Sequence, residues 1–259
     1  MFGFWKKKKK LPPKEALPPI ENFTNIDPFI TYFKEETGID FLNKKDIVTN
    51  KLMIFCRNHE IYTFDDCIQK IRGNYELKQK LIDTFAVNET YFFREIRQIK
   101  AMVSKAIQRQ EKIQILCAPC SSGEEPYSIA ILLLEAGIDA ERFHITGVDI
   151  SNKAILKAKQ ALYNKRSLHR VEDTLINKYF TQKNESYELK AFVKQNVSFE
   201  RMNIFDPHFM NLPKFDYIFS RNMMIYFDDA TKQKAKNILL KHLKDPKEPI
   251  LFGHADMVG

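Results

Sequence analysis

The sequence predicts an α/β fold, in which helices cover both faces of a mostly parallel sheet, with a small all-helical domain before it. Three observations lead to this prediction. Strand-like and helix-like segments alternate from Ile113 onward, which is typical of a parallel sheet. Residues 26–87 show helical apolar spacing and lack a strand signal. A polar stretch at residues 163–196 interrupts the alternation, which indicates an insertion.

Length and composition fit a folded protein of two domains. The chain has 259 residues, of which 44% are hydrophobic and 29% charged, so general disorder is excluded. The longest aliphatic run, Ile129–Leu134, is far shorter than the roughly 20 residues that a membrane span needs.

Residues 1–25 have the composition of a flexible tail that is basic and rich in proline. Four prolines exclude a regular helix there, and Lys6–Lys10 are five consecutive positive charges. Without that run the net charge falls from +8 to +3, so the basic balance gives little support to a nucleic-acid partner. Phe2, Phe4 and Trp5 beside the lysines suit weak contact with an anionic membrane surface, and a solvated tail is the alternative.

Residues 26–93 are expected to form the helical domain. Asp27-Pro28 is typical of a helix start, with Asp27 as the cap and Pro28 at the first helical position, and Gly38 is typical of a helix end. Three more short helices should follow, two of them capped by Thr63 and Asn74. A basic linker helix is expected within residues 94–112, from about Arg94 to Gln110.

The sheet domain is expected over residues 113–259. Its predicted strands are Ile113–Ala118, Phe143–Val148, Val197–Met202, Phe215–Phe219 and Pro249–Gly253. Helices should begin near Pro126, at Ser151 and at Asp229. The segments Tyr179–Thr181 and Tyr187–Leu189, on either side of Lys183–Glu185, predict a small helix and a β-hairpin inside the insertion.

Four cysteines are too few for a disulfide framework at this length, so we expect a reducing, cytoplasmic setting. Cys117-x-x-Cys120 invites a zinc interpretation, but a structural zinc site needs two further ligands at suitable spacing. We therefore interpret these residues as structural thiols and expect no metal.

The turn after the first strand has the features of a cofactor cradle. In parallel sheets, ligands bind where the strands end, and the residues Cys117–Pro126 form a glycine-containing turn before a helix start. Gly123 should let the backbone approach a ligand. The sequence lacks a phosphate-binding Gly-Lys-Ser motif, which argues against nucleotide hydrolysis.

Polar residues from several segments should meet at the same edge of the sheet. Asp149 ends the second strand, where an acidic residue can accept ribose hydroxyls; helix capping is the alternative. Further polar side chains lie at strand ends or before the linker helix: Asn203, Arg221, Asn222, Asn88, Thr90 and Arg94. Together they predict one site.

Several of these segments resemble the chemotaxis receptor methyltransferases of the CheR type. The resemblance rests on Asn88–Glu95, Ser122–Ser128, Asp149-Ile150 and Arg221–Phe227, in the family's order. It implies a class I S-adenosylmethionine-dependent methyltransferase, with residues 113–259 as the methyltransferase domain and the insertion as a β-subdomain that faces the receptor. The implied reaction methylates receptor glutamates and gives glutamate methyl esters and S-adenosylhomocysteine.

The resemblance also implies roles for residues. Carried over by motif, the cofactor pocket would be lined by Asn88, Thr90, Arg94, Gly123, Glu125, Asp149, Asn203, Ile204, Arg221 and Asn222. Glu125 would pair with the α-ammonium group, Asp149 with the ribose and Asn203 with the adenine edge. Arg94 and Tyr226 would be the catalytic residues, close to the transferred methyl group and the incoming carboxylate.

Two departures from the family pattern stand out. Ile54 and Phe55 lie where better-known members carry arginines that dock on the receptor, so that docking mode is in doubt here. The segment Gly253–Asp256 resembles the family's GHSE segment, but the customary final antiparallel strand has no counterpart. We therefore expect six main strands, unless the C-terminal tail contributes another.

The expected partner is the cytoplasmic domain of methyl-accepting chemoreceptors, and we expect a monomer without a nucleic-acid partner. Two other functions remain in competition. One is a catalytically silent module that senses the cofactor or acts as a scaffold. The other is a nucleic-acid methyltransferase, against which stands the lack of an Asn-Pro-Pro-aromatic motif.

Overall fold

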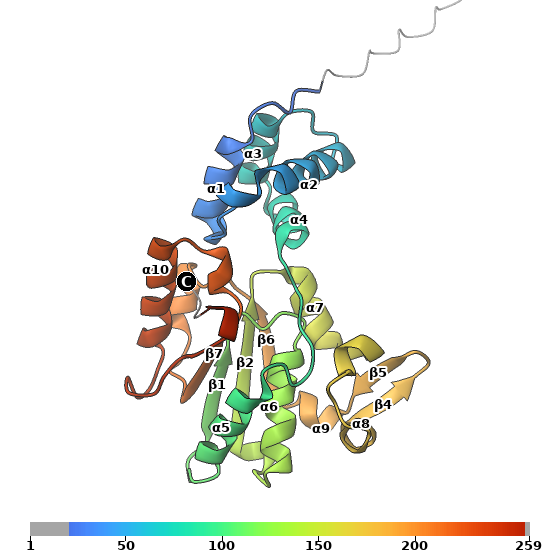
Figure 1. Ribbon diagram of the computed structural model, residues 1–259, viewed down its shortest axis with the longest axis vertical. Helices are drawn as coiled ribbons and strands as arrows, with labels where there is room; N and C mark the ends of the chain where they lie inside the picture. The colour runs from blue at the N-terminus through green and yellow to red at the C-terminus, as the bar shows by residue number, and fades with distance from the viewer. Residues whose placement is uncertain (1–20, 257–259) are drawn as a thin grey trace, which may run out of the picture.

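The computed structural model describes residues 21–256. They form a helical domain, a five-stranded sheet domain and a small three-stranded sheet (Figure 1). The tail considered for membrane contact lies largely outside the described residues, as do residues 257–259. Within the part that is described, no helix combines the length and the apolar character needed to cross a membrane.

The helical domain contains α1 (Asp27–Thr37), the 3₁₀ turn η1 (Leu42–Lys44), α2 (Lys45–Asn58), α3 (Phe64–Gly73) and α4 (Tyr75–Phe85). The side chain of Thr63 accepts a hydrogen bond from the Asp66 N–H, and that of Asn74 accepts one from the Leu77 N–H. Both predicted caps are confirmed. Asp27 is the first residue of α1 and not its cap.

Aromatic side chains fill the core of this domain. The rings of Phe29, Phe33 and Phe85 pack with centroids 5.5–5.7 Å apart. The core is separate from the cores on the two faces of the main sheet. The helical domain therefore has its own apolar interior.

The linker helix α5 spans Ile96–Ala106 and is shorter than predicted at both ends. Phe93 and Glu95 have φ of 61° and 49°, in the left-handed region. An α-helix cannot pass through such residues, so Arg94 lies in the turn before α5. The prediction of a helix from Arg94 was wrong.

The main sheet has the strand order β6-β2-β1-β7-β8, and every pairing is parallel. Its strands are β1 (Ile113–Cys117), β2 (Phe143–Asp149), β6 (Val197–Arg201), β7 (Tyr217–Ser220) and β8 (Leu251–Phe252). Five strands over the described residues correct the expectation of six. The stretch between β6 and β7 forms the 3₁₀ helix η4 (Pro207–Asn211), and the insertion builds a sheet of its own.

Helices cover both faces of the main sheet. Ile113, Ile115 and Cys117 of β1 face a core shared with α5, α6 (Glu124–Glu135), α7 (Asn152–Gln160) and α9 (Ala191–Lys194). Leu116 faces the opposite core, which η4 and α10 (Asp229–Lys241) cover. The fold is the α/β arrangement predicted for a class I methyltransferase (Figure 1).

The insertion contains the predicted hairpin and one strand more. The strands β4 (Phe180–Lys183) and β5 (Ser186–Leu189) are antiparallel, and Asn184 takes a positive φ of 54° in the turn between them. A third strand, β3 (Leu162–Asn164), pairs with β5. The turn η3 (Lys165–Leu168) and the helix α8 (Asp173–Tyr179) complete this subdomain.

The helical domain makes hydrogen bonds with three segments that follow strands of the main sheet. The side-chain amide of Gln79 donates to the Ile150 carbonyl at 3.0 Å, after β2. Asn203, after β6, donates to the Glu36 carbonyl at 2.8 Å. The Asp40 N–H donates to the Tyr226 carbonyl at 2.8 Å, after β7. The helical domain therefore covers the carboxyl ends of these strands.

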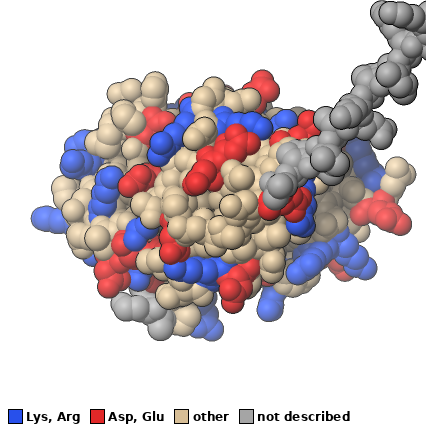
Figure 2. Space-filling view, turned by 90° about the horizontal axis from the view of Figure 1, so that it is seen from above, with Lys and Arg blue, Asp and Glu red and all other residues tan. Residues whose placement is uncertain are grey.

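Charged side chains of both signs are mixed on the face of the helical domain. Figure 2 shows blue and red side chains interspersed there. A field of one sign, which nucleic-acid binding favours, is not seen on this face.

Cys56, Cys67, Cys117 and Cys120 are free and buried.

Candidate functional site

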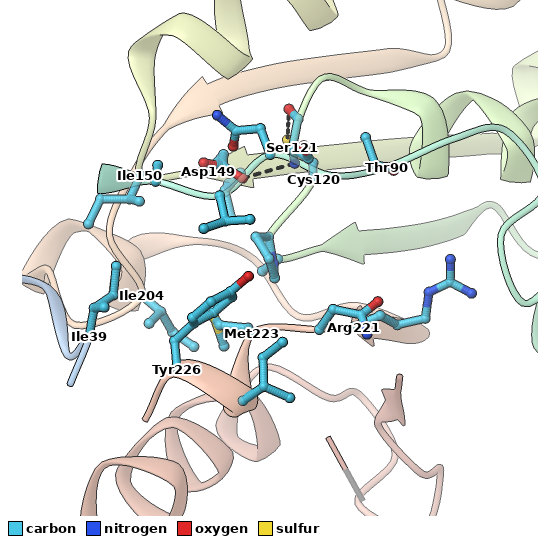
Figure 3. A pocket seen from close by; sticks show the side chains of 18 of the residues that line it. Ile39, Thr90, Cys120, Ser121, Asp149, Ile150, Ile204, Arg221, Met223 and Tyr226 are labelled. Carbon is cyan, nitrogen blue, oxygen red and sulfur yellow. Dashed lines mark hydrogen bonds between the residues drawn. The ribbon is translucent and has the colours of Figure 1, made fainter. Parts of the chain in front are cut away.

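A cavity of about 210 Å³ lies between the carboxyl ends of the strands and the helical domain. Figure 3 shows Asp149 and Ser121 on one side of it and Tyr226 on the other, with the Tyr226 hydroxyl pointing into the space between them. Residues from Thr37 to Phe227 contribute to its walls. The site is thus assembled from segments far apart in the sequence.

Nearly all of the predicted site residues surround this one cavity. They are Asn88, Thr90, Arg94, Glu125, Asp149, Asn203, Ile204, Arg221, Asn222 and Tyr226. Gly123 does not line it. Gly123 caps α6 with φ of 92°, and a Cβ there would lie 2.9 Å from the Cβ of Ala158. The glycine serves the turn and the packing of α6 against α7, and its predicted role beside a ligand stays a prediction.

Asp149 is a buried carboxylate at the end of β2. One oxygen accepts from the Ser121 N–H and the other from the Ser151 N–H, both at 2.9 Å. Burial raises the pKa of Asp149 to about 6, in spite of these hydrogen bonds. Ser151 itself caps α7 by accepting from the Ala154 N–H. Capping is therefore done by Ser151, and Asp149 remains at the wall of the cavity.

Glu125 and Arg221 form a buried ion pair through Glu125 Oε2 and Arg221 Nε. Burial raises the pKa of Glu125, while the positive charge of Arg221 acts against that shift. The second carboxylate oxygen, Oε1, is buried and has no hydrogen-bond partner among residues 21–256. An unpaired buried acceptor costs free energy, so this oxygen suits a ligand that brings a donor.

Arg221 also fixes the segment that carries Arg94. Its Nη1 donates to the Arg94 carbonyl at 2.9 Å. The Phe93 N–H donates to Ser128 Oγ and the Phe92 N–H to the Ser167 carbonyl, both at 2.9 Å. The backbone on both sides of Arg94 is therefore held while its side chain remains partly exposed.

The Arg94 side chain lines the cavity and is partly exposed. Its Nη1 donates to the Glu89 carbonyl at 3.0 Å, and its guanidinium lies 5.9 Å from the Tyr91 ring centroid. Burial raises the pKa of Tyr226, and the positive charge of Arg94 acts in the opposite direction. The two side chains are thus electrostatic neighbours.

The remaining predicted residues contribute in different ways. Asn203 has both ends of its amide engaged, by the Glu36 carbonyl and by the Phe205 N–H at 3.0 Å. It connects the two domains at the rim, although each end keeps capacity for a second hydrogen bond. Ile204 is buried and adds apolar wall. Asn222 has φ of 60°, which turns the chain sharply after β7.

Sequence reasoning missed several lining residues. Ile39 enters the wall from the helical domain, and no local pattern announces it. Ser121 lies in the turn that was singled out as a cradle, with φ of 47° and a buried hydroxyl that has no partner in the described chain. The turn itself was the available signal for Ser121.

The residues present fit S-adenosylmethionine. The free Oε1 of Glu125 suits an ammonium group, because a buried carboxylate oxygen is satisfied by a charged donor. Asp149 offers a carboxylate to hydroxyl donors, and Ser121 Oγ remains available near it. Ile39, Val148, Ile204 and Phe227 provide apolar walls for a ring.

Comparison with known families agrees with this geometry. The family model described as "CheR methyltransferase, SAM binding domain" matches residues 88–259. The match includes every strand of the main sheet and the segment before α5. It begins after the helical domain.

Curated relatives extend the similarity to the helical domain. The chemotaxis protein methyltransferase of Campylobacter jejuni is 35% identical over 251 residues, covering 96% of this chain and 92% of its own. Chemotaxis protein methyltransferase 2 of Vibrio cholerae is 33% identical over 249 residues, covering 91% and 86%. The probable biofilm formation methyltransferase WspC of Pseudomonas putida is 31% identical over 240 residues, covering 90% of this chain and 56% of its own.

Proposed function

The chain belongs to the CheR family of S-adenosylmethionine-dependent methyltransferases, and from this premise we propose that it methylates glutamate side chains of chemoreceptors. The products are glutamate methyl esters and S-adenosylhomocysteine. The relatives named chemotaxis protein methyltransferases support the receptor as the methyl acceptor.

One observation carries the proposal: a single cavity joins two kinds of chemistry. Glu125 and Asp149 offer buried carboxylates suited to the amino-acid and ribose ends of the cofactor. Arg94 and Tyr226 lie on the same cavity and are suited to an incoming carboxylate. A pocket that only sensed the cofactor would not need this second pair.

The reaction makes few acid–base demands on the protein. S-adenosylmethionine supplies an electrophilic methyl group on a sulfonium sulfur. A glutamate side chain has an ordinary pKa of about 4.3, so the acceptor is already ionised at neutral pH. A general base is therefore unnecessary, and the protein contributes alignment and exclusion of water.

Arg94 and Tyr226 are the residues that we assign to the acceptor. The planar guanidinium of Arg94 can donate two parallel hydrogen bonds to a carboxylate. Among residues 21–256 its partly exposed side chain makes one hydrogen bond, to the Glu89 carbonyl, so within that range donors remain for the acceptor. The half-buried ring of Tyr226 lines the cavity and adds apolar surface beside the acceptor.

The acceptor has a route to this point through a second cavity of about 490 Å³. It shares Ile225, Tyr226 and Phe227 with the cofactor cavity, and Val87 and Ile39 line both. Lys44 and Lys51 line only the second one. Lys44 Nζ lies 5.8 Å from the Tyr226 ring centroid, which suits guidance of an acidic side chain toward Tyr226, because the aspartates of the same cavity, Asp40 and Asp228, are paired with Lys34.

The outer face of α2, beside this route, is partly apolar. Ile47 is 70% exposed and Ile54 is 59% exposed, one heptad apart on the helix. Phe55, by contrast, is buried in the domain core. Of the two positions that depart from the family's arginines, only Ile54 is available to a partner. We propose that receptor docking here combines Ile47 and Ile54 with the lysines of the second cavity.

Transfer of a labelled methyl group tests the proposed function. The full chain is incubated with labelled S-adenosylmethionine and receptor-rich membranes, and the labelled receptor is then treated with mild base. Esters release the label, whereas N-methyl groups on a nucleic acid or an amine keep it. A catalytically silent module would transfer nothing while still binding S-adenosylhomocysteine. Receptors with the acceptor glutamates changed to alanine are the control.

A further inference from the structure

The segment that follows β8 places a carboxylate under the turn after β7. Asp256 Oδ1 accepts from the Met224 N–H at 2.8 Å. Its Oδ2 accepts from the N–H of Asn222 and, at 3.0 Å, from that of Gly253. One side chain therefore satisfies three backbone donors, two of them in the turn that carries Asn222 and Tyr226.

That turn needs such support because its conformation is unfavourable alone. Asn222 is in the left-handed region, and the short 3₁₀ turn η5 (Met224–Tyr226) follows. Neither element supplies acceptors for its first N–H groups. The Asp256 carboxylate supplies them, and so fixes the direction in which the chain leaves β7.

The same segment also contacts the start of α5. The His254 N–H donates to Glu95 Oε2 at 3.1 Å, next to Arg94. The side-chain amide of Gln98 donates to the Phe252 carbonyl at 2.7 Å. The end of β8 and the residues after it therefore connect the two segments that bear Arg94 and Tyr226, although Asp256 does not line the cofactor cavity.

We propose that Asp256 is a positioning residue for methyl transfer, which holds the Asn222–Tyr226 turn in register with the Arg94 segment. The inference rests on the proposed function. It assigns to Asp256 no contact with cofactor or acceptor. Its effect is on the alignment of Tyr226, and misplacement of a group by about 1 Å can cost on the order of 100-fold in rate.

The Asp256 carboxylate and the three backbone N–H groups that it accepts from are together called the clamp. The packing around Gly253 supports a tight fit of this clamp. A Cβ at Gly253 would lie 3.0 Å from the Asn222 N, from Asn222 Nδ2 and from Asp256 Oδ2. Two of these atoms, Asn222 N and Asp256 Oδ2, are donor and acceptor of one clamp hydrogen bond, and the third belongs to the Asn222 side chain. A methyl group at position 253 would therefore press on the clamp without removing any of its donors or acceptors.

The main test compares Asp256→Asn with the wild-type chain. An amide keeps the size of the side chain, but its NH₂ group must face at least one backbone N–H, so one donor loses its acceptor. We expect kcat at saturating cofactor and receptor to fall by about 10-fold or more. The Kd for S-adenosylhomocysteine, measured by calorimetry, should change much less than kcat, because Glu125 and Asp149 are untouched and, of the residues that Asp256 bonds, only Asn222 lines the cofactor cavity.

A matched control and two further variants separate positioning from folding. Asp245→Asn makes the same change at an exposed loop carboxylate that accepts from the Lys247 N–H, and should leave kcat unchanged. Asp256→Glu keeps the charge and should restore most of the rate. Gly253→Ala should lower kcat although every polar group of the clamp is retained. If Asp256→Asn does not fold, these last two variants still decide the matter.

Coupling and amide exchange complete the experiment. The rate losses of Asp256→Asn and Tyr226→Phe should not add in the double variant, because both act at Tyr226. Faster hydrogen exchange of the Asn222 and Met224 amides is expected in Asp256→Asn, whichever molecule accepts the methyl group. Additive losses, unchanged exchange, or a lowered Tm with normal kcat would each overturn the inference. Absence of wild-type methyl transfer would instead count against the proposed function.

Discussion

Arg221 joins the two halves of the pocket, because its guanidinium pairs with Glu125 and donates to the Arg94 carbonyl. Glu125 belongs to the cofactor half and Arg94 to the acceptor half. A change at Glu125 should therefore weaken the binding of the cofactor and also loosen the other half.

Glu125→Gln should weaken S-adenosylhomocysteine binding by about 1.5–3 kcal/mol, the value of a hydrogen bond to a charged group. The variant also leaves Arg221 buried without its counter-charge, so the Tm should fall. Calorimetry and thermal unfolding measure the two effects. Glu124→Gln is the matched control: Glu124 is buried but bonded to Ser122 and Ser167, away from the cavity. Equal affinity losses in both variants would refute the assignment of Glu125.

Substitutions of Arg94 and of Asp149 should impair different steps, turnover and cofactor binding respectively. Asp149→Ala should weaken cofactor binding by about 1.5–3 kcal/mol for each charged hydrogen bond lost. Arg94→Ala should mainly lower turnover at saturating cofactor, and Arg94→Lys should be impaired too, because lysine lacks the planar fork. Arg97→Ala, on the exposed face of α5, is the control. Normal turnover of Arg94→Ala once cofactor saturates would make Arg94 a binding residue only.

Cofactor affinity should depend on pH through Asp149. Its pKa is raised by burial from 3.8 to about 6, so protonation favours the free folded protein. That contribution to stability is full below about pH 4 and is lost as the pH rises through about 6. The ionised carboxylate is the better acceptor for ribose hydroxyls, so S-adenosylhomocysteine should bind about tenfold more weakly at pH 5 than at pH 7. Asp149→Asn should lose this slope, and an unchanged slope would exclude Asp149 as its source.

Lys44→Ala should raise the KM for the receptor several-fold and leave the Kd for S-adenosylhomocysteine unchanged. The reason is that Lys44 lines the acceptor route beside Tyr226 and not the cofactor cavity. Lys45→Ala provides the comparison, since Lys45 is exposed, lines neither cavity and pairs with Asp27 at 2.7 Å. Steady-state methylation at varied receptor concentration gives both constants. Equal effects of the two variants would remove the specific role of Lys44.

Gly38→Ala should destabilise the protein more than Gly137→Ala. Both glycines have positive φ, 80° and 75°, where alanine costs on the order of 1 kcal/mol. A Cβ at Gly38 would also lie 2.3 Å from the ring of Phe205, in the sheet domain, whereas nothing lies within 4 Å at Gly137. Thermal unfolding of the two variants measures the difference. Equal Tm values would show that the Phe205 ring can move away from a Cβ at position 38 without a loss of stability.

Local sequence signals predicted the elements whose ends are set by single side chains. The caps at Thr63, Asn74 and Ser151 and the end of α1 at Gly38 are examples. The polar residues after β2, β6 and β7 could be placed together because parallel strands end at one edge.

The features that the sequence did not predict depend on contacts between residues far apart in the chain. The turn around Arg94 is held by Ser128, Ser167 and Arg221, so residues other than glycine accept a left-handed backbone there, and nothing local announces it. The strand β3 has three residues and exists through its pairing with β5. Ile39 reaches the pocket only because the helical domain sits over the strand ends.

The strand order has a consequence for the protein as it is synthesised. The helical domain emerges first and can bury its own aromatic core. The central strand β1, however, waits for β7, since Leu116 pairs with Ile218 and Gln114 bonds to Asp216, 102 residues later. Asp256 emerges later still. A nascent chain therefore cannot complete the catalytic half of its pocket until β7 and Asp256 have left the ribosome, well after the helical domain can fold.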